Sequence, residues 1–135
     1  RLLNRTLSRI RAGSIMVISD SCYSGAFGGN KSIHRNRNNS NFREFGQWQT
    51  RTSISSGGQE PVEDGTDQSP FTRALVDVLT QNEGIISGLQ LFTVVHNLTI
   101  QVADQTPEYS VLTEAGHAGN GDILFVRSDA PGGSI

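Results

Sequence analysis

The sequence predicts an α/β fold in one domain, and three observations lead to this prediction. Residues 15–18 form an uninterrupted apolar run, which is typical of a strand buried on both faces in a parallel sheet. Two later segments, 71–79 and 89–102, carry apolar residues at helical spacing. The chain of 135 residues has the usual length of one domain and can bury a core, although only 35% of its residues are hydrophobic.

The chain starts inside a predicted helix. Leu3, Leu7 and Ile10 follow the spacing of one helix face, and no capping residue precedes Leu2. This pattern indicates that the sequence is the later part of a longer protein, with the early strands of the sheet absent. We therefore expect one edge of the sheet to be open, and the isolated chain to be unstable or to self-associate.

A polar connection separates the first predicted strand from the second. Residues 28–51 show no periodicity and are rich in Asn, Ser, Gly and Arg, so they are predicted to form a long mobile surface loop. A second strand is expected over residues 52–56, followed by a polar acidic turn region over residues 57–68.

The two later helices have clear start signals. Ser69 and Pro70 have the pattern of an N-cap followed by proline at the first helical position. Ser87 and Gln90 have the spacing of a capping box, and the second helix should end before Pro107. The apolar run 123–126 predicts a final strand, so the domain spans residues 1–127, and residues 128–135 are expected to be a disordered tail.

Composition excludes several classes of protein. The sequence has 11 Lys and Arg residues and 13 Asp and Glu residues, so its net charge gives no reason to expect nucleic acid or an anionic membrane as a partner. No segment approaches the ~18 consecutive apolar residues of a membrane-spanning helix, and the start lacks a signal peptide. The single cysteine allows no internal disulfide. We expect a soluble, cytoplasmic protein.

Cys22 stands where a functional site is expected. It follows the buried strand directly, and sites in open α/β sheets lie at the carboxyl ends of strands. Its neighbours, among them Asp20 and Ser24, are polar and would each need a hydrogen-bond partner in a core. The backbone amide of Gly25 can serve as an oxyanion donor. The alternative is an inert buried thiol, because free cysteine is among the most buried residue types.

The segment around Cys22 resembles a known family. Residues 17–25, VISDSCYSG, resemble the nucleophile segment of caspase-like cysteine peptidases, in the metacaspase and bacterial orthocaspase branch, which carry Asp-x-Cys-(His/Tyr)-Ser-Gly after a buried strand. Tyr23 favours the bacterial type. The resemblance continues over almost the whole chain, in the first strand of the small-subunit region, the helix that follows it and the run into the last strand: residues 52–56, 69–75, 105–109 and 121–126.

This resemblance implies a fold and an activity. The fold would be a caspase-like three-layer sandwich with a mostly parallel central sheet. The activity would be hydrolysis of a polypeptide substrate by the thiolate of Cys22. Asp20 would line an acidic S1 pocket together with Ser55, and a carboxylate there selects cleavage after Arg or Lys. The alternative for Asp20 is a structural acceptor that caps loop amides.

The catalytic histidine is the missing part of the predicted dyad. The family's histidine lies upstream of the nucleophile segment, whereas His34, His96 and His117 all follow Cys22. Of these, His117 in a glycine-rich loop is the alternative base. Truncation explains the absence better, so the upstream half of the same protein is expected to supply the histidine. The rival interpretation is a catalytically inactive caspase-like module that binds or scaffolds other proteins.

The long predicted loop contains basic residues that the acidic S1 pocket of the same enzyme could bind. Autoprocessing is one interpretation, and a solvated connector that is never cut is the other. The expected cleavage positions are the five basic residues of the exposed chain: Lys31, Arg35, Arg37, Arg43 and Arg51.

Acidic residues in the turn region raise the question of calcium, which many metacaspases need. Calcium activation follows from the resemblance, but the spacing does not match an EF-hand loop and favours a solvated turn. No metal ligand is therefore assigned, and no cofactor is certain. The residues concerned are Glu60, Glu63, Asp64 and Asp67.

Overall fold

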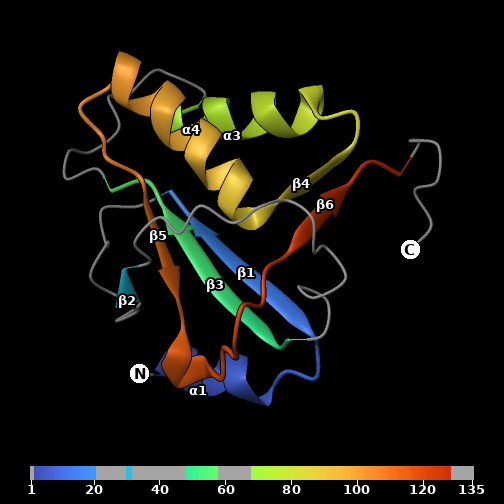
Figure 1. Ribbon diagram of the computed structural model, residues 1–135. Coiled ribbons are helices and arrows are strands. Elements are labelled where there is room, and N and C mark those ends of the chain that lie inside the picture. The colour runs from blue at the N-terminus through green and yellow to red at the C-terminus, as the bar shows by residue number, and fades with distance from the viewer. Residues whose placement is uncertain (1, 21–29, 32–47, 58–67, 129–135) are drawn as a thin grey trace.

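The computed structural model describes residues 2–20, 30–31, 48–57 and 68–128, and it confirms a mixed α/β fold (Figure 1). Each predicted helix and strand has a counterpart, and short elements occur between them. In chain order the elements are α1 (Leu2–Arg9), β1 (Ser14–Ser19), β2 (Asn30–Lys31), β3 (Thr50–Ser55), α3 (Pro70–Gln81), β4 (Ile85–Ser87), α4 (Gly88–Val102), β5 (Glu108–Val111), the 3-10 helix η2 (Thr113–Ala115) and β6 (Leu124–Val126).

The main sheet is mixed, with the strand order β1-β3-β5-β2. β1 and β3 are parallel, whereas β5 is antiparallel to both β3 and β2. The expectation of a mostly parallel sheet is therefore wrong for the described strands. The reason is the pair of helices between β3 and β5. After one helix the chain would stand at the amino end of β3, and the next strand would be parallel to β3. Because α4 runs back along α3, the chain instead returns to the carboxyl end of β3, and β5 starts there in the antiparallel direction (Figure 1).

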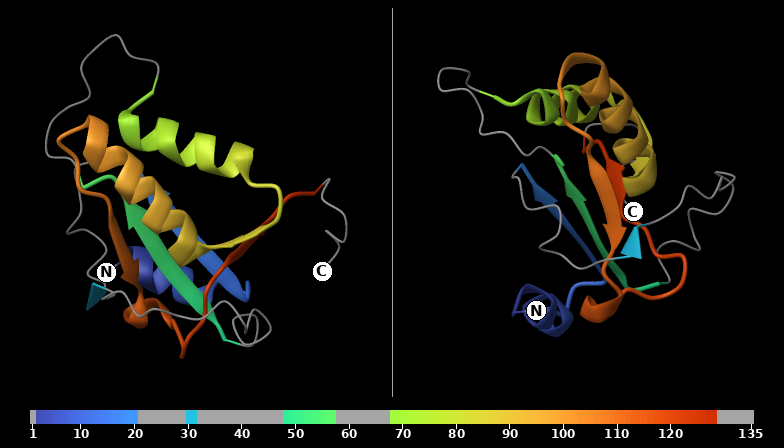
Figure 2. Two further views of the ribbon diagram at one scale, coloured as in Figure 1. Left: turned by 45° about the horizontal axis from the view of Figure 1, so that its top comes forward. Right: turned by 90° about the vertical axis from the view of Figure 1, so that its left-hand side faces the viewer.

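Helices cover both faces of the sheet at different heights (Figure 2). α3 and α4 pack on one face, where Ile54, Phe71, Leu91 and Tyr109 belong to the larger apolar core. α1 lies near the amino ends of β1 and β3, and a smaller cluster forms there around Leu7. The carboxyl ends of β1 and β3 therefore lie beside α3, away from α1.

The predicted helix starts are confirmed. The side chain of Ser69 caps α3 by accepting a hydrogen bond from the Thr72 amide at 3.0 Å, and Pro70 takes the first helical position. Both halves of the capping box between Ser87 and Gln90 are present at the start of α4. α4 ends at Val102, before the proline that was expected to limit it.

The two parallel strands reverse the burial that their sequences suggest. Residues 15–18 lie in a strand as predicted, but the prediction that they are buried on both faces is wrong. β1 is an edge strand among the described strands, and Ile18 is 37% exposed. β3, a polar segment, is buried at all six positions. β3 has strands on both sides, whereas β1 has one described neighbour, and this difference in position explains the reversal.

Several segments differ from their predicted boundaries. The loop expected over residues 28–51 contains β2, and β3 begins inside its last residues at Thr50. The predicted final strand exists as β6, but it pairs with β4 in a second, two-stranded sheet. Residues 129–135, most of the predicted tail, lie outside the described residues. Among the described helices, none has the length and apolar character needed to cross a membrane.

Candidate functional site

Asp20 stands at the carboxyl end of β1, next to the start of α3. It is exposed, and its Oδ2 atom accepts hydrogen bonds from two hydroxyl groups of α3. The Oγ atom of Ser69 is one donor, and Oγ1 of Thr72 is the other, at 2.6 Å. The structure therefore joins the end of β1 to the start of a helix that lies far along the chain.

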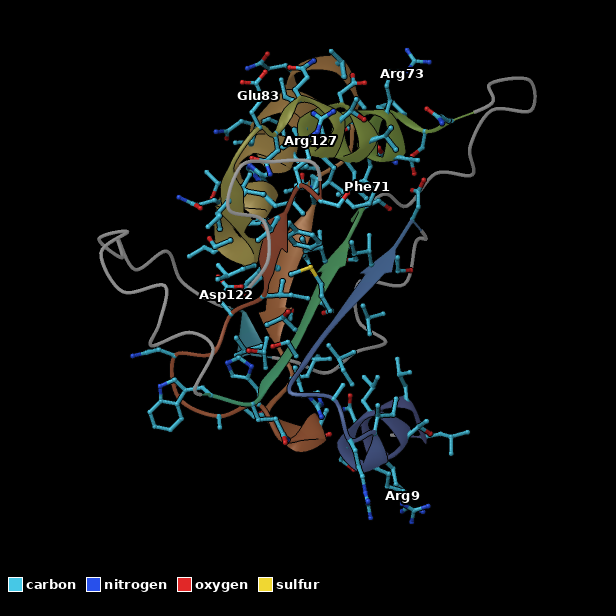
Figure 3. The ribbon with its side chains drawn as sticks, turned by 90° about the vertical axis from the view of Figure 1, so that its right-hand side faces the viewer. Arg9, Phe71, Arg73, Glu83, Asp122 and Arg127 are labelled. Carbon is cyan, nitrogen blue, oxygen red and sulfur yellow. The ribbon has the colours of Figure 1, made fainter. Side chains whose placement is uncertain are left out.

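Local chemistry explains why Asp20 is held there. The hydroxyl oxygen of Ser69 is occupied as the N-cap acceptor for the Thr72 amide, so its one proton is free to be donated to Asp20. The start of a helix also carries partial positive charge, which favours a carboxylate. Packing supports the same arrangement, since Phe71 is fully buried between α3 and the strand ends (Figure 3).

Ser55 is the last residue of the neighbouring strand β3, and its side chain points away from α3. It is the register partner of Ser19, the residue before Asp20, and its side chain is 4% exposed. Successive side chains of a strand point to opposite faces. Because Ile54 belongs to the core under α3 and α4, Ser55 points to the other face. The structure thus places the two predicted S1 residues at adjacent strand ends, with side chains on opposite faces of the sheet.

The predicted nucleophile lies outside the described residues. This holds for Cys22, for the candidate oxyanion donor Gly25, and for Arg35, Arg37 and Arg43 of the predicted loop. Lys31 is described in its backbone alone, where it pairs with Ser110 of β5. The roles of these residues stay predictions.

The structure contradicts the prediction that Arg51 is an exposed processing site. It was expected in exposed chain as a processing site, but it lies in the central strand β3 and is 1% exposed. Its guanidinium donates to four backbone carbonyl groups, so its burial needs no carboxylate partner. The acceptors are the carbonyl oxygens of Leu7 at 3.2 Å, Ile10 at 3.0 Å, Gly13 at 3.4 Å and Thr50 at 2.8 Å. A protease cannot bind the chain at Arg51 in this folded state.

Of the two described histidines, His117 lies away from Asp20. Nδ1 of His117 accepts a hydrogen bond from the Arg51 amide at 3.0 Å, at the amino end of β3, whereas Asp20 lies at the opposite end of the sheet. This position does not favour His117 as the base, but Cys22 lies outside the described residues, so the alternative stays a prediction. His96 lies on α4, and its ring packs against Phe92 with a centroid distance of 5.5 Å. His34 lies outside the described residues.

Asp122 is a buried carboxylate that sequence reasoning missed. It is 5% exposed and lies near the start of α4 (Figure 3). Its Oδ2 accepts from the Leu89 amide at 3.2 Å, and its Oδ1 accepts from the Ile123 amide at 2.8 Å. These contacts give it a structural role in joining α4 to the segment before β6. A signal was present in the sequence, namely a lone acidic residue directly before an apolar run.

Metal ligands do not gather in the part of the chain that is described, where no group of three His, Cys, Asp or Glu side chains could hold an ion. The acidic residues of the turn region, Glu60 to Asp67, lie outside the described residues, so calcium binding there stays an open expectation.

Comparison of the chain with protein-family models, with curated proteins and with solved structures gave no match.

Proposed function

We propose that the chain is part of a caspase-like cysteine endopeptidase that cleaves polypeptides after Arg or Lys. The observation that supports this most is the placement of Asp20. The segment 20–22 begins at the carboxyl end of a strand that runs parallel to its neighbour, and the carboxylate is exposed and fixed by α3. In open α/β sheets this edge is where ligands bind.

In the proposed reaction Cys22 is the nucleophile. A histidine from the upstream half of the protein removes the thiol proton, and the thiolate attacks the scissile carbonyl carbon. The amide of Gly25 stabilises the oxyanion that forms. The histidine then protonates the leaving amine, and water hydrolyses the acyl-enzyme to release the second product and restore the thiol.

Asp20 supplies the selection of substrate in this proposal. It lies two residues before Cys22, so a side chain that precedes the scissile bond can reach it. A carboxylate at that distance favours a cationic side chain over an acidic one. The proposed three-layer sandwich is supported by α1 on one face of the β1-β3 pair and by α3 and α4 on the other.

An inactive module that binds or scaffolds proteins is the second candidate. The position of His117 favours it, because this histidine lies at the other end of the sheet from Asp20. In that case Asp20 is an acceptor at the start of α3 and has no role in binding substrate.

Cleavage of fluorogenic peptides by the full-length protein tests the proposal. Peptides that end in Arg, Lys or Asp would be assayed with and without calcium. We expect turnover after Arg and Lys that is abolished in Cys22→Ala, and loss of that turnover in Asp20→Ala, with Asp77→Ala on the exposed surface of α3 as the matched control.

The outcomes separate the candidates. Turnover after Asp alone would keep the peptidase and refute the role of Asp20. Absence of turnover under every condition would favour the inactive module.

Autoprocessing is proposed at the basic residues of the loop, with Arg51 removed from the set because it is buried. Mass spectrometry of the purified full-length enzyme should find fragments that end at Lys31, Arg35, Arg37 or Arg43. The same preparation of Cys22→Ala should contain the uncut chain alone. Identical fragments in both preparations would assign the cuts to another protease.

A further inference from the structure

Both hydroxyl groups at the start of α3 donate to the same oxygen of Asp20. Ser69 and Thr72 each bind Oδ2, and in the part of the chain that is described Oδ1 accepts no hydrogen bond. A carboxylate oxygen has two lone pairs. The two hydroxyl groups therefore occupy both lone pairs of Oδ2, whereas no described residue competes for Oδ1.

The direction of these bonds is fixed by the helix. Ser69 is 4% exposed, and its hydroxyl oxygen accepts a hydrogen bond from the Thr72 amide. Its hydroxyl proton is donated to Asp20. Thr72 donates its hydroxyl proton to Asp20 while its amide is held by Ser69. The start of α3 thus determines which oxygen of Asp20 the helix engages and which one it leaves without a bond from a described residue.

This asymmetry affects how a cation can bind. Arg binds a carboxylate best through two parallel hydrogen bonds, one to each oxygen. With Oδ2 occupied, a guanidinium can make its contact through Oδ1 alone. The ammonium of Lys is a compact charge that needs one acceptor, so it loses nothing from this arrangement.

We propose that Ser69 and Thr72 are positioning residues that set the preference among basic substrates, by occupying Oδ2 of Asp20 and leaving Oδ1 to bind the substrate cation. The enzyme then accepts Lys and Arg on similar terms. This inference rests on the proposed peptidase function, and it adds the residues that tune the pocket.

The ratio of two rate constants tests the inference. Values of kcat/KM would be measured with the full-length protein on two peptides that differ only in Arg or Lys before the scissile bond. Thr72→Val frees one lone pair of Oδ2, so the ratio of Arg to Lys should rise about tenfold, the worth of one hydrogen bond to a charged group. Thr72→Ser keeps the hydroxyl and should keep the wild-type ratio.

Two further variants complete the design. Thr80→Val makes the same change at an exposed position near the other end of α3, and it should leave the ratio unchanged. Ser69→Gly removes the other donor, and glycine is tolerated at an N-cap, so the ratio should again rise. Ser69→Gly tests the inference even if Thr72→Val does not fold.

The results distinguish this inference from the proposed function. An unchanged ratio in both Thr72→Val and Ser69→Gly, or an equal loss of activity on both peptides, would overturn the inference and leave the peptidase intact. Failure of the wild-type enzyme to cleave either peptide would overturn both.

Discussion

β1 and β3 are parallel neighbours with opposite composition and opposite burial. β1 has the sequence SIMVIS and lies at the edge of the described sheet, whereas β3 has the sequence TRTSIS and is buried along its whole length. Their residues pair one to one, and Ile18 stands beside Ile54. The comparison shows that the place of a strand in the sheet determines its burial, and that hydrophobicity alone is a poor guide to it.

A polar strand can be buried because distant segments satisfy its polar groups. The amide of Thr50 donates to the carbonyl of Gly13 at 2.8 Å, and the amide of Arg51 donates to His117. The guanidinium of Arg51 binds the carbonyl groups at the end of α1, which also carry the negative partial charge of the helix. Burial of a polar group is costly only when such partners are missing.

The largest expected effect comes from removing the Arg51 guanidinium. Arg51→Met keeps the volume of the side chain but leaves the carbonyl groups of Leu7 and Ile10 without this donor. We expect the free energy of unfolding to fall by about 4 kcal/mol, because several buried polar groups lose a charged partner together. Urea unfolding followed by circular dichroism measures this change.

Arg73→Met is the matched control, because Arg73 is exposed on α3 (Figure 3). Its effect should stay within about 0.5 kcal/mol. Equal effects at both positions would refute the structural role assigned to the buried guanidinium.

The paired isoleucines give a smaller and more direct test of the comparison. Ile54 is 0% exposed in β3, and Ile54→Ala should lower the free energy of unfolding by about 3 kcal/mol through the cavity that it leaves. Ile18 is 37% exposed in β1, so Ile18→Ala should cost about 1 kcal/mol or less. Chemical denaturation of the two variants under identical conditions provides the comparison.

A different result would be informative about the edge of the sheet. If Ile18→Ala destabilises the protein as much as Ile54→Ala does, a segment outside the described residues covers β1 there.

The parts of the fold that depend on local chemistry were predictable from the sequence. The N-cap at Ser69, the proline after it and the capping box at Ser87 each act within one helical turn, and the structure contains all three. The strand at residues 15–18 follows from its apolar run, and the α/β class follows from that run together with the helical spacing of the later segments.

The remaining features depend on contacts between segments that are far apart. Asp20 could be selected from its motif, but the residues that hold it lie 49 and 52 positions away. Arg51 looked like exposed loop because its partners come from the end of α1. The antiparallel direction of β5 depends on how α4 folds back along α3, and the apolar spacing within a single helix does not encode this.

The central place of β3 also bears on the order of folding. On one side of β3, Thr50 pairs with Ser14 of β1, and on the other side Thr52 pairs with Val111, beyond both helices. Neither pairing is local, so each requires the closure of a long loop before any contact compensates for the lost chain entropy. The helix pair α3 and α4 is compact in sequence and can form early, and the sheet would then assemble on it as the slow step.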